Sequence, residues 1–259
     1  MTHFKIVSVG WNCMAYLENT LRSIESQDYD DYEVMIVDDA TPENIPQGAL
    51  IEKWCETKRD IRDYRWKSTV NTTQRYATAN QRDAIIALDP APEDVIVFVD
   101  LDGDRLAHPG VLNHLDSVYQ DPDVWLTYGN YRPIPDEGTS PPAIPFPPKT
   151  VANRDYRKEV LRAGSYFNHL RTMKGKVFWG IPEEAYHWGA NIHNPIYQHG
   201  CDYIFMIAGL EVANGKYRCL DDVLLLYNHA NPFADNKSHP AESSSCVIDF
   251  LNQKPVKPL

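Results

Sequence analysis

The sequence predicts an α/β fold with a mostly parallel central sheet flanked by helices. Strand-like and helix-like segments alternate along the N-terminal half, and such alternation implies βαβ units. Residues 94–99 give the strongest strand signal, apolar after the first residue, as expected for a central strand covered on both faces. Aspartates directly follow two of the predicted strands. Because ligands of parallel sheets bind beyond the carboxyl ends of the strands, these aspartates mark a candidate site.

Hydrophobic spacing locates the first elements. Residues 4–9 are a β-rich run, and the apolar residues that follow repeat three or four apart, as in a helix, at Met14, Leu17, Leu21 and Ile24. A second strand at 33–37 leads through a turn-forming segment to a helix around 49–58. Residues 62–67 are predicted as a third strand.

The rest of the chain follows the same logic. A helix at 78–88 ends before two prolines, and the segment 132–149 has too many prolines for a regular helix or an interior strand. We therefore expect an extended loop there, joining two halves of one domain. Beyond it we expect helices at 156–162 and 202–214, and short strands at 217–220 and 223–227.

Composition argues against several classes of protein. The net charge of −11 does not suit a general nucleic-acid surface, which needs clustered basic residues, so any bound phosphate is expected to need a metal. No stretch approaches the roughly 20 apolar residues of a membrane helix, and no signal peptide is expected. An odd number of cysteines without a CxxC pair indicates a reducing cytoplasm. They are Cys13, Cys55, Cys201, Cys219 and Cys246.

Carboxylates gather on the predicted rim of the sheet. Asp38 and Asp39 follow one strand, and Asp100 and Asp102 follow another in an Asp-x-Asp pattern. Several hard oxygen ligands suit Mg²⁺ or Mn²⁺ together with diphosphate oxygens. Such a cation stabilises a departing nucleoside diphosphate. An acidic cluster can also merely solvate a loop, and the pattern alone does not decide between the two.

The N-terminal stretch VSVGWNCMAYLENTLRSIESQDYDDYEVMIVDDATPEN resembles the opening of family 2 glycosyltransferases. There a strand, an N-x-x-x-x-L-x-x-x-L-x-S-I helix and a VDD strand terminus follow in order, although here Ala40-Thr41 replaces the usual Gly-Ser. The resemblance implies a GT-A fold, with a Rossmann-like sheet and a smaller C-terminal acceptor-binding part. It implies inverting transfer of a sugar from a nucleoside diphosphate sugar, by default UDP-linked, to an acceptor hydroxyl with the help of Mn²⁺ or Mg²⁺. Carbohydrate and other hydroxyl-bearing acceptors remain open.

The second half resembles one branch of the same transferases. The matching segments are HLRTMKGKVF and GCDYIFMIAGLEVANGKYRCLDDVLLLYNHANPFADNK. We therefore expect a single domain, 1–259, in four parts. They are a nucleotide-sugar-binding half at 1–131, a proline-rich loop at 132–150, an acceptor and catalytic half at 151–237, and a tail at 238–259.

The resemblance also implies roles in donor binding. One of Asp38 and Asp39, by preference Asp39, would recognise the base or ribose, although aspartate also caps turns. Arg82 lies in A-N-Q-R, where the family has an A-R-N-like segment near the nucleotide. Asp100 and Asp102 would face the metal and diphosphate, and His229 would be a further metal ligand or a solvated loop histidine. Basic side chains suited to the diphosphate, or to a solvated helix face, are His169, Arg171 and Lys174.

Asp202 matches the catalytic base of the family. A carboxylate there would accept the proton of the acceptor hydroxyl as its oxygen attacks the anomeric carbon, while the alternative role is to cap the following helix. Glu211 on that helix is expected either to bind the acceptor or to form a buried ion pair. The aromatic stretch 178–189 would stack on acceptor sugars or fill the core. His187, His193 and His199 have no usual zinc spacing.

Two rival functions remain at this point. VIVFVDLDGD also resembles the nucleophile strand of haloacid dehalogenase-type phosphohydrolases, with Asp100 as the nucleophile and Asp102 as the acid/base. Asp104-Arg105 departs from that motif, and its later Ser/Thr and Lys signals are not evident. The other rival is a non-catalytic sugar- or nucleotide-binding protein that keeps the fold.

Overall fold

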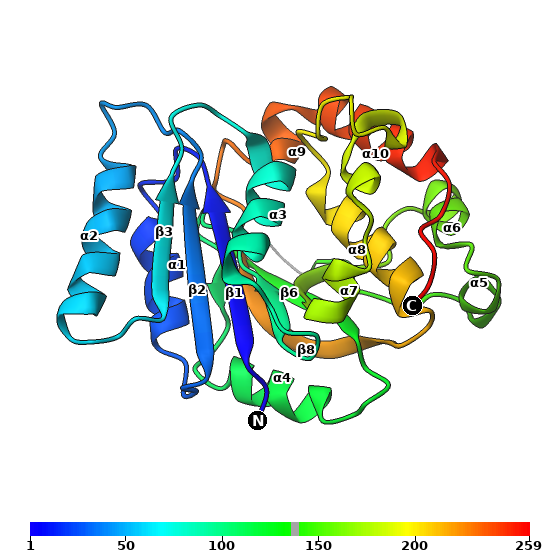
Figure 1. Ribbon diagram of the computed structural model, residues 1–259, viewed down its shortest axis with the longest axis horizontal. Helices are drawn as coiled ribbons and strands as arrows, with labels where there is room; N and C mark the ends of the chain where they lie inside the picture. Colours follow the sequence, from blue (N-terminus) through cyan, green and yellow to red (C-terminus); the bar gives the residue numbers. More distant parts are fainter. Residues whose placement is uncertain (136–139) are drawn as a thin grey trace.

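The computed structural model describes residues 1–135 and 140–259, and the described residues build a central sheet of eight strands (Figure 1). The strand order is β3-β2-β1-β4-β7-β6-β8-β5. Strands β3, β2, β1 and β4 run parallel, as do β6 and β8, whereas β7 is antiparallel to both neighbours and β5 to β8. The predicted mostly parallel α/β sheet is confirmed. The strands are β1 (Phe4–Gly10), β2 (Tyr32–Asp38), β3 (Trp66–Val70), β4 (Val95–Phe98), β5 (Arg105–Leu106), β6 (Leu126–Ile134), β7 (Asn168–Lys174) and β8 (Tyr217–Asn228).

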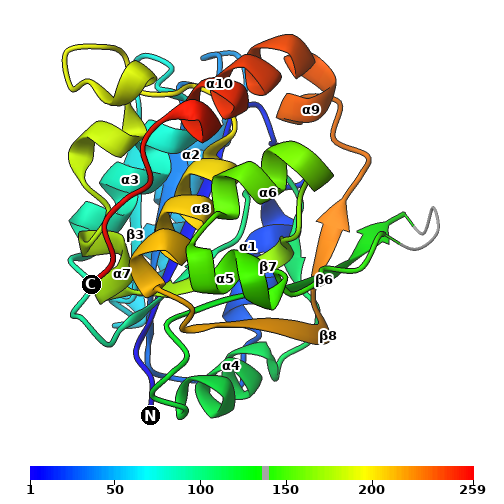
Figure 2. The same cartoon turned by 90° about the vertical axis from the view of Figure 1, so that its right-hand side faces the viewer.

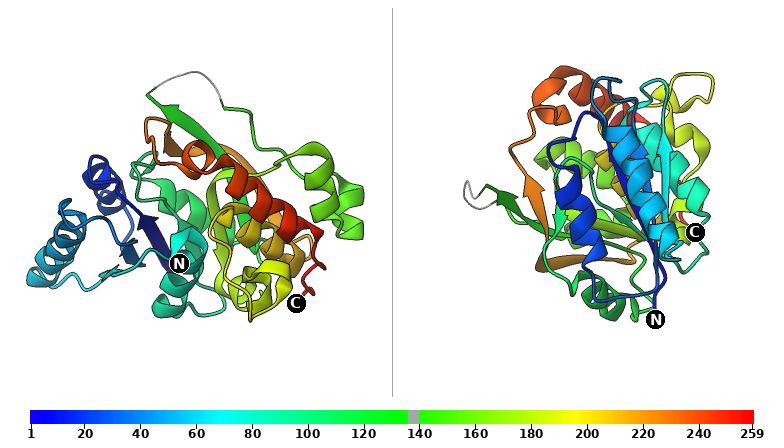
Figure 3. Two further views of the ribbon diagram at one scale, coloured as in Figure 1. Left: turned by 90° about the horizontal axis from the view of Figure 1, so that it is seen from above. Right: turned by 90° about the vertical axis from the view of Figure 1, so that its left-hand side faces the viewer.

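Helices cover both faces of the sheet because the strands bury side chains alternately on each side. Phe4 and Ile6 of β1 join a core with α1, α2 and α4, whereas Val7 and Val9 join the core beneath α3 and α8. Figure 3 shows the N-terminal helices and the α5–α6 segment at opposite ends of the molecule. The helices are α1 (Leu17–Glu25), α2 (Gln47–Asp60), α3 (Tyr76–Leu88), α4 (Val111–Tyr119), α5 (Pro148–Asn153), α6 (Tyr156–Ala163), α7 (Gly175–Trp179), α8 (Cys201–Ala213), α9 (Asp235–Ser238) and α10 (Pro240–Asn252).

Three predicted elements differ from those observed. The third strand begins at Trp66, four residues later than expected, after a turn that holds Arg62 at a positive φ. The two short strands predicted after Gly215 are one continuous strand, β8, which stays paired with β6 through shifts in register. The predicted proline-rich loop is partly regular, since β6 reaches Ile134 and α5 begins at Pro148. Residues 136–139 of that loop lie outside the described part of the chain.

The C-terminal segment, treated as a tail in the sequence analysis, contains the helix α10. Its Phe250 and Leu251 are buried, and Figure 2 shows it lying alongside α6 and α8. Beneath it, Glu211 of α8 receives two hydrogen bonds from the guanidinium of Arg157, at 2.7 and 3.0 Å, and one from the backbone N–H of Val256 at 2.8 Å. Glu211 is fully buried. Of the two expected roles, acceptor binding and a buried ion pair, its contacts match the ion pair. This pair ties α6, α8 and the C-terminal segment together.

No membrane-spanning helix occurs in residues 1–135 and 140–259, because none of their helices combines the required length and apolar character.

Candidate functional site

The candidate site is built on the loop that joins β4 to β5. This loop carries Asp100, Asp102 and Asp104, and it turns at Gly103, whose φ of +106° is a conformation that favours glycine. A Cβ on Gly103 would lie 2.5 Å from the side-chain nitrogen of Asn228, so the loop is packed tightly on the end of β8. Three carboxylates are thereby held within five residues, in a setting that is largely shielded from water.

Burial and mutual repulsion disfavour the charged forms of two of these carboxylates. Burial, followed by the charge of Asp100, raises the pKa of Asp102 to about 6. Asp104 is fully buried, and burial together with the charge of Asp102 holds its pKa well above its usual range. Such groups are expected to take up either a proton or a metal cation, because an uncompensated buried charge is costly.

Two asparagines, Asn228 at the end of β8 and Asn231 in the loop after it, hold the β4–β5 loop. The side-chain amide of Asn228 donates to the carbonyl of Asp102 at 2.6 Å, and its backbone N–H donates to Oδ1 of Asp104 at 2.8 Å. Asn231 donates from its amide to Oδ2 of Asp102 at 2.8 Å. Among the described residues, Oδ1 of Asp102 and Oδ2 of Asp104 are buried without a hydrogen-bond partner. Sequence reasoning missed both asparagines, although YNHANP was part of the resemblance, and it did not assign Asp104 as a ligand although Asp104 continues the Asp-x-Asp pattern.

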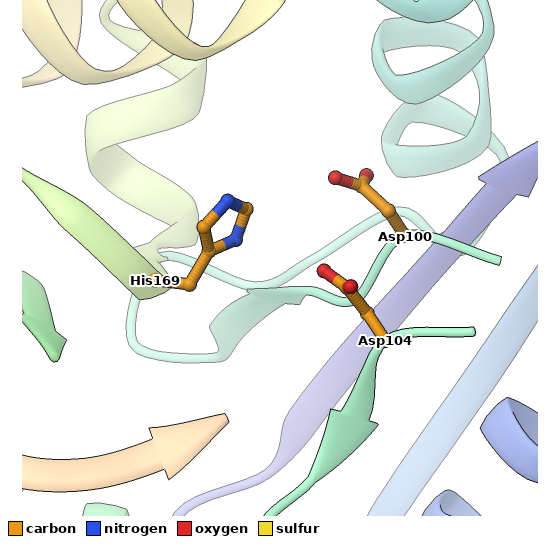
Figure 4. Close-up of side chains that lie close together, drawn as sticks. All are labelled: Asp100, Asp104 and His169. Atoms are coloured by element: carbon orange, nitrogen blue, oxygen red, sulfur yellow. The ribbon is translucent and has the colours of Figure 1, made fainter. Parts of the chain in front are cut away.

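Asp100, Asp104 and His169 form a group able to hold a metal ion, with one ligand atom of each within 4.8 Å of the others. Figure 4 shows the three side chains facing one another. Burial, followed by the charge of Arg171, holds the pKa of His169 well below its usual value, so its ring is neutral. Its Nδ1 lies 3.3 Å from the guanidinium of Arg171, so the imidazole lone pair would bind a cation in place of that contact. The unpartnered oxygen of Asp104, the Asp100 carboxylate and this neutral imidazole fit a divalent cation. Asp102 lies outside this group, although its charge interacts with that of Asp100.

Arg171 connects this group to Asp202. Its guanidinium lies 3.4 Å from Oδ2 of Asp100 and forms an ion pair with Asp202, and the side chain is almost fully buried. The antiparallel register pairs Arg171 with Phe98, next to the end of β4. Lys174 pairs instead with Val95 at the opposite end and contacts Glu93, so it lies away from the site.

Asp202 lies in the first turn of α8, with 41% of its side chain exposed. Among the contacts of the described residues, its carboxylate accepts from Arg171 and, at 3.4 Å, from the thiol of Cys201. It accepts no described bond from the backbone of α8, so its contacts are not those of a helix cap. The carboxylate is thus both accessible and linked through one arginine to Asp100.

Asp38 and Asp39 differ in their surroundings. Asp38 is buried and accepts hydrogen bonds from Thr41 at 2.5 Å and Gln47 at 2.7 Å, which stabilise the turn after β2. Asp39 accepts from the backbone N–H groups of Arg75 and Tyr76 at 2.7 and 2.8 Å. A third bond, from the amide of Asn71, is 3.0 Å long. Asp39 therefore secures the start of α3 and keeps part of its acceptor capacity.

The loop that carries Asp100, Asp102 and Asp104 is called the carboxylate loop. Two further predicted site residues, Arg82 and His229, contact other parts of the chain. Arg82 forms ion pairs with Glu183 and Asp83, whereas its neighbour Gln81 donates to Asp100 at 3.3 Å. His229 packs its ring against Tyr227, with centroids 5.0 Å apart, and does not belong to the Asp100–Asp104–His169 group. Its role as a metal ligand stays a prediction.

The aromatic stretch 178–189 mainly fills the core. Phe178 and Tyr186 are buried, and Trp188 packs against Tyr197. Trp179 is half exposed, but its indole N–H donates to the carbonyl of Pro90. Most of these rings therefore support the fold.

Comparison with known proteins identifies the family. Residues 6–178 match the family described as Glycosyl transferase family 2. The chain belongs to glycosyl transferase family 2. It is accordingly a glycosyltransferase with a GT-A fold, and the comparisons give no support to the phosphohydrolase alternative. No curated protein matches the sequence significantly.

Several solved structures share this fold. S. aureus TarS 1-349 in complex with UDP-GlcNAc has a TM-score of 0.64 at 15% identity, over 98% of this chain and 68% of TarS 1-349. The mannosyltransferase PcManGT from Pyrobaculum calidifontis, in complex with GDP-Man and Mn²⁺, has a TM-score of 0.58 at 17% identity, over 96% and 62%. Glucosyl-3-phosphoglycerate synthase from Mycobacterium tuberculosis, in complex with UDP, has a TM-score of 0.57 at 12% identity, over 98% and 81%. This chain spans 66% of TarS 1-349 in another of its crystal structures and 43% of a longer TarS structure.

Proposed function

We propose that this glycosyltransferase moves a sugar from a UDP-linked donor to an acceptor hydroxyl with inversion at the anomeric carbon, assisted by a divalent cation. The observation that carries the proposal is the link from the carboxylate loop to Asp202 through the buried Arg171. It sets a cation-binding group and an accessible carboxylate on either side of one guanidinium. An inverting displacement needs such a pair, since the base and the leaving group lie on opposite sides of the reacting carbon.

The carboxylate loop would hold Mn²⁺ or Mg²⁺. Asp100, Asp102 and Asp104 offer oxygen ligands and His169 offers a nitrogen, while His229 remains a further candidate. When bound, the cation neutralises the charge that develops on the departing diphosphate. The PcManGT structure with GDP-Man and Mn²⁺ supports a metal in this family of folds.

Asp202 would act as the general base. Its exposed carboxylate can accept the proton of an acceptor hydroxyl, and Arg171 would keep it oriented by the ion pair that the two residues form. The same guanidinium, next to Asp100, is suited to donate to a diphosphate oxygen when the donor enters. Arg171 would therefore serve both substrates.

Asp39 and Asp38 would shape the nucleotide end of the cleft. Asp39 follows β2 on the rim that also carries Asp100, and three hydrogen bonds fix its carboxylate. Its remaining acceptor capacity suits an N–H of a base or a ribose hydroxyl. Asp38 would act on the nucleotide through the turn that it stabilises, and Arg82 would need to leave its ion pairs to reach a phosphate. Two solved structures with this fold contain UDP-GlcNAc and UDP, and they support a uridine nucleotide as the donor.

The five cysteines form no disulfide in the described chain and four of them are buried, which supports the proposed location in a reducing cytoplasm.

A nucleotide screen with a base variant tests the proposal. UDP at about 100 times its Kd with Mn²⁺ should stabilise the fold by about 2.7 kcal/mol, a rise in Tm of about 5–10 °C, whereas GDP and ADP should give little shift. Asp202→Asn should keep this shift but lose about 10²–10⁴-fold in sugar transfer, and Asp123→Asn, at an exposed surface aspartate, should keep both. NMR of the product should show the inverted anomer. Retention of configuration, or full transfer by Asp202→Asn, would refute the mechanism. A protein that only binds would shift in Tm with UDP yet transfer no sugar.

A further inference from the structure

We propose that Asn231 is a positioning residue for the cation site, fixing the Asp102 carboxylate so that its Oδ1 is left to bind the metal. The inference rests on the proposed function, because it concerns the cation that this function requires. Asn231 comes from the loop after β8, 129 residues from Asp102 in the sequence. It touches neither nucleotide nor acceptor in this role and acts only through Asp102.

The orientation of the Asn231 side chain is determined by two different partners. Its amide nitrogen donates to Oδ2 of Asp102 at 2.8 Å, and its amide oxygen accepts the backbone N–H of Phe233 at 3.0 Å. Turning the amide over would set an oxygen against the carboxylate and a nitrogen against an N–H donor, so only one orientation satisfies both. With 3% of Asn231 exposed, water is a poor substitute for either bond.

A neutral donor suits this position chemically. It occupies one oxygen of Asp102 and leaves the other, which is buried and has no hydrogen-bond partner among the described residues. A lysine or arginine here would pair with the carboxylate and compete with a cation for its charge. An amide orients the carboxylate yet leaves its negative charge uncompensated, as partners of metal ligands commonly do.

The loop that carries Asn231 is itself fastened. Lys237 donates from its ammonium group to the backbone carbonyls of His229 and Asn231. The hydroxyl of Tyr16 lies 3.4 Å from the carbonyl of Ala230. Because Lys237 holds the same loop without contacting Asp102, its removal separates loop order from the action of the Asn231 amide.

Titration with Mn²⁺ alone, with free Mn²⁺ followed by electron paramagnetic resonance, tests the inference without any measurement of transfer. Asn231→Ser keeps an oxygen for the Phe233 N–H but is too short to reach Asp102. It should weaken Mn²⁺ binding about 10- to 100-fold. In an Asp102→Ala background the same substitution should change the Kd by no more than about twofold, since the two residues act as one unit. Lys237→Ala should likewise stay within about twofold of the wild type.

Each outcome bears on the inference. If Asp102→Ala weakens Mn²⁺ binding but Asn231→Ser does not, the inference is wrong and the proposed function stands. If Lys237→Ala weakens binding as much as Asn231→Ser, loop order and not the amide is responsible, which also overturns it. If the wild type binds no Mn²⁺, the metal-assisted function and the inference fall together. Thermal unfolding of each variant identifies any that fails to fold, and Asn231→Ala then provides a second substitution at the same position.

Discussion

Replacing Gly103 with alanine tests the packing of the carboxylate loop against β8. A Cβ at this position would lie 2.5 Å from Nδ2 of Asn228 and 2.9 Å from Cβ of Tyr16, distances that side chains do not tolerate. The φ of +106° adds a backbone cost for any L-residue. The loop, Asn228 or both must therefore move.

The size of the effect follows from these two contributions. Backbone strain costs about 1–2 kcal/mol. Displacing Asn228 breaks its 2.6 Å hydrogen bond to the carbonyl of Asp102, and the loss of one hydrogen bond costs about 0.5–1.5 kcal/mol. A total of about 2–3 kcal/mol corresponds to a fall in Tm of about 4–12 °C for a chain of this size. Mn²⁺ binding should weaken as well, because Asp102 and Asp104 flank the substituted residue.

Gly164→Ala is the matched control. Gly164 also has a positive φ, +88°, but a Cβ there would meet no heavy atom within 4 Å. With a ψ of −163° its backbone lies in a region that is essentially restricted to glycine, so the variant carries backbone strain alone, about 1–3 kcal/mol, and should leave Mn²⁺ binding unchanged. Thermal and urea unfolding measure both variants. If Gly103→Ala lost no more stability than Gly164→Ala, or bound Mn²⁺ as the wild type does, the packing argument would be wrong.

Three other substitutions test separate parts of the structure. Arg157→Met should cost about 3–5 kcal/mol in urea unfolding because it leaves Glu211 charged and buried, and adding Glu211→Leu should recover part of the loss. Ala40→Gly should raise Tm by about 1–4 °C. Glycine relieves the backbone strain at a φ of +60°, and this gain outweighs the cost of about 0.4–1 kcal/mol that the added entropy of the unfolded chain brings. A lower Tm would contradict this expectation. The hydrogen bond from Arg65 lowers the pKa of Asp63 below its ordinary 3.8, so the stabilisation is present above that pH and is lost as the pH falls through the lowered pKa. Urea unfolding should show the wild type to be more stable than Asp63→Asn at about pH 7, and this difference should become smaller as the pH is lowered to about 3. A difference that became larger on acidification would contradict the lowered pKa of Asp63.

Local hydrophobic pattern was enough to predict the N-terminal part of the sheet. β1, β2 and β4 and the helices between them have regular apolar spacing, and the three parallel strands are neighbours in the sheet. The start of the third strand was misplaced because Tyr64 lies two residues before Trp66 and looks like part of the same strand, although residues 62–65 form a turn. Burial against α2 and β2, which only the fold determines, selects Trp66 as its start.

In the C-terminal part of the chain, the strands and the site contacts depend more on residues that are distant in the sequence. β8 reads as two strands because Asp221 and Asp222 interrupt its apolar pattern, yet pairing with β6 continues past them. The sequence also gave no sign that Asn228 and Asn231 would meet Asp102, because a hydrogen bond across more than a hundred residues leaves no local pattern. The Asp-x-Asp pattern predicted Asp100 and Asp102 as the carboxylates of the cation site, whereas the tertiary fold brings Asp100 together with Asp104 and His169.

Strand direction explains which basic residue of β7 reaches the site. The resemblance offered Arg171 and Lys174 equally as partners of the diphosphate. In a parallel strand the later residue would lie nearer the rim at which β4 ends. Because β7 runs antiparallel to β4, its beginning lies there, so Arg171 meets Asp100 while Lys174 lies at the far end. The side chain of His169 lies next to that of Arg171, with Nδ1 3.3 Å from the guanidinium, so one short segment of β7 supplies both a candidate nitrogen ligand and the link to Asp202.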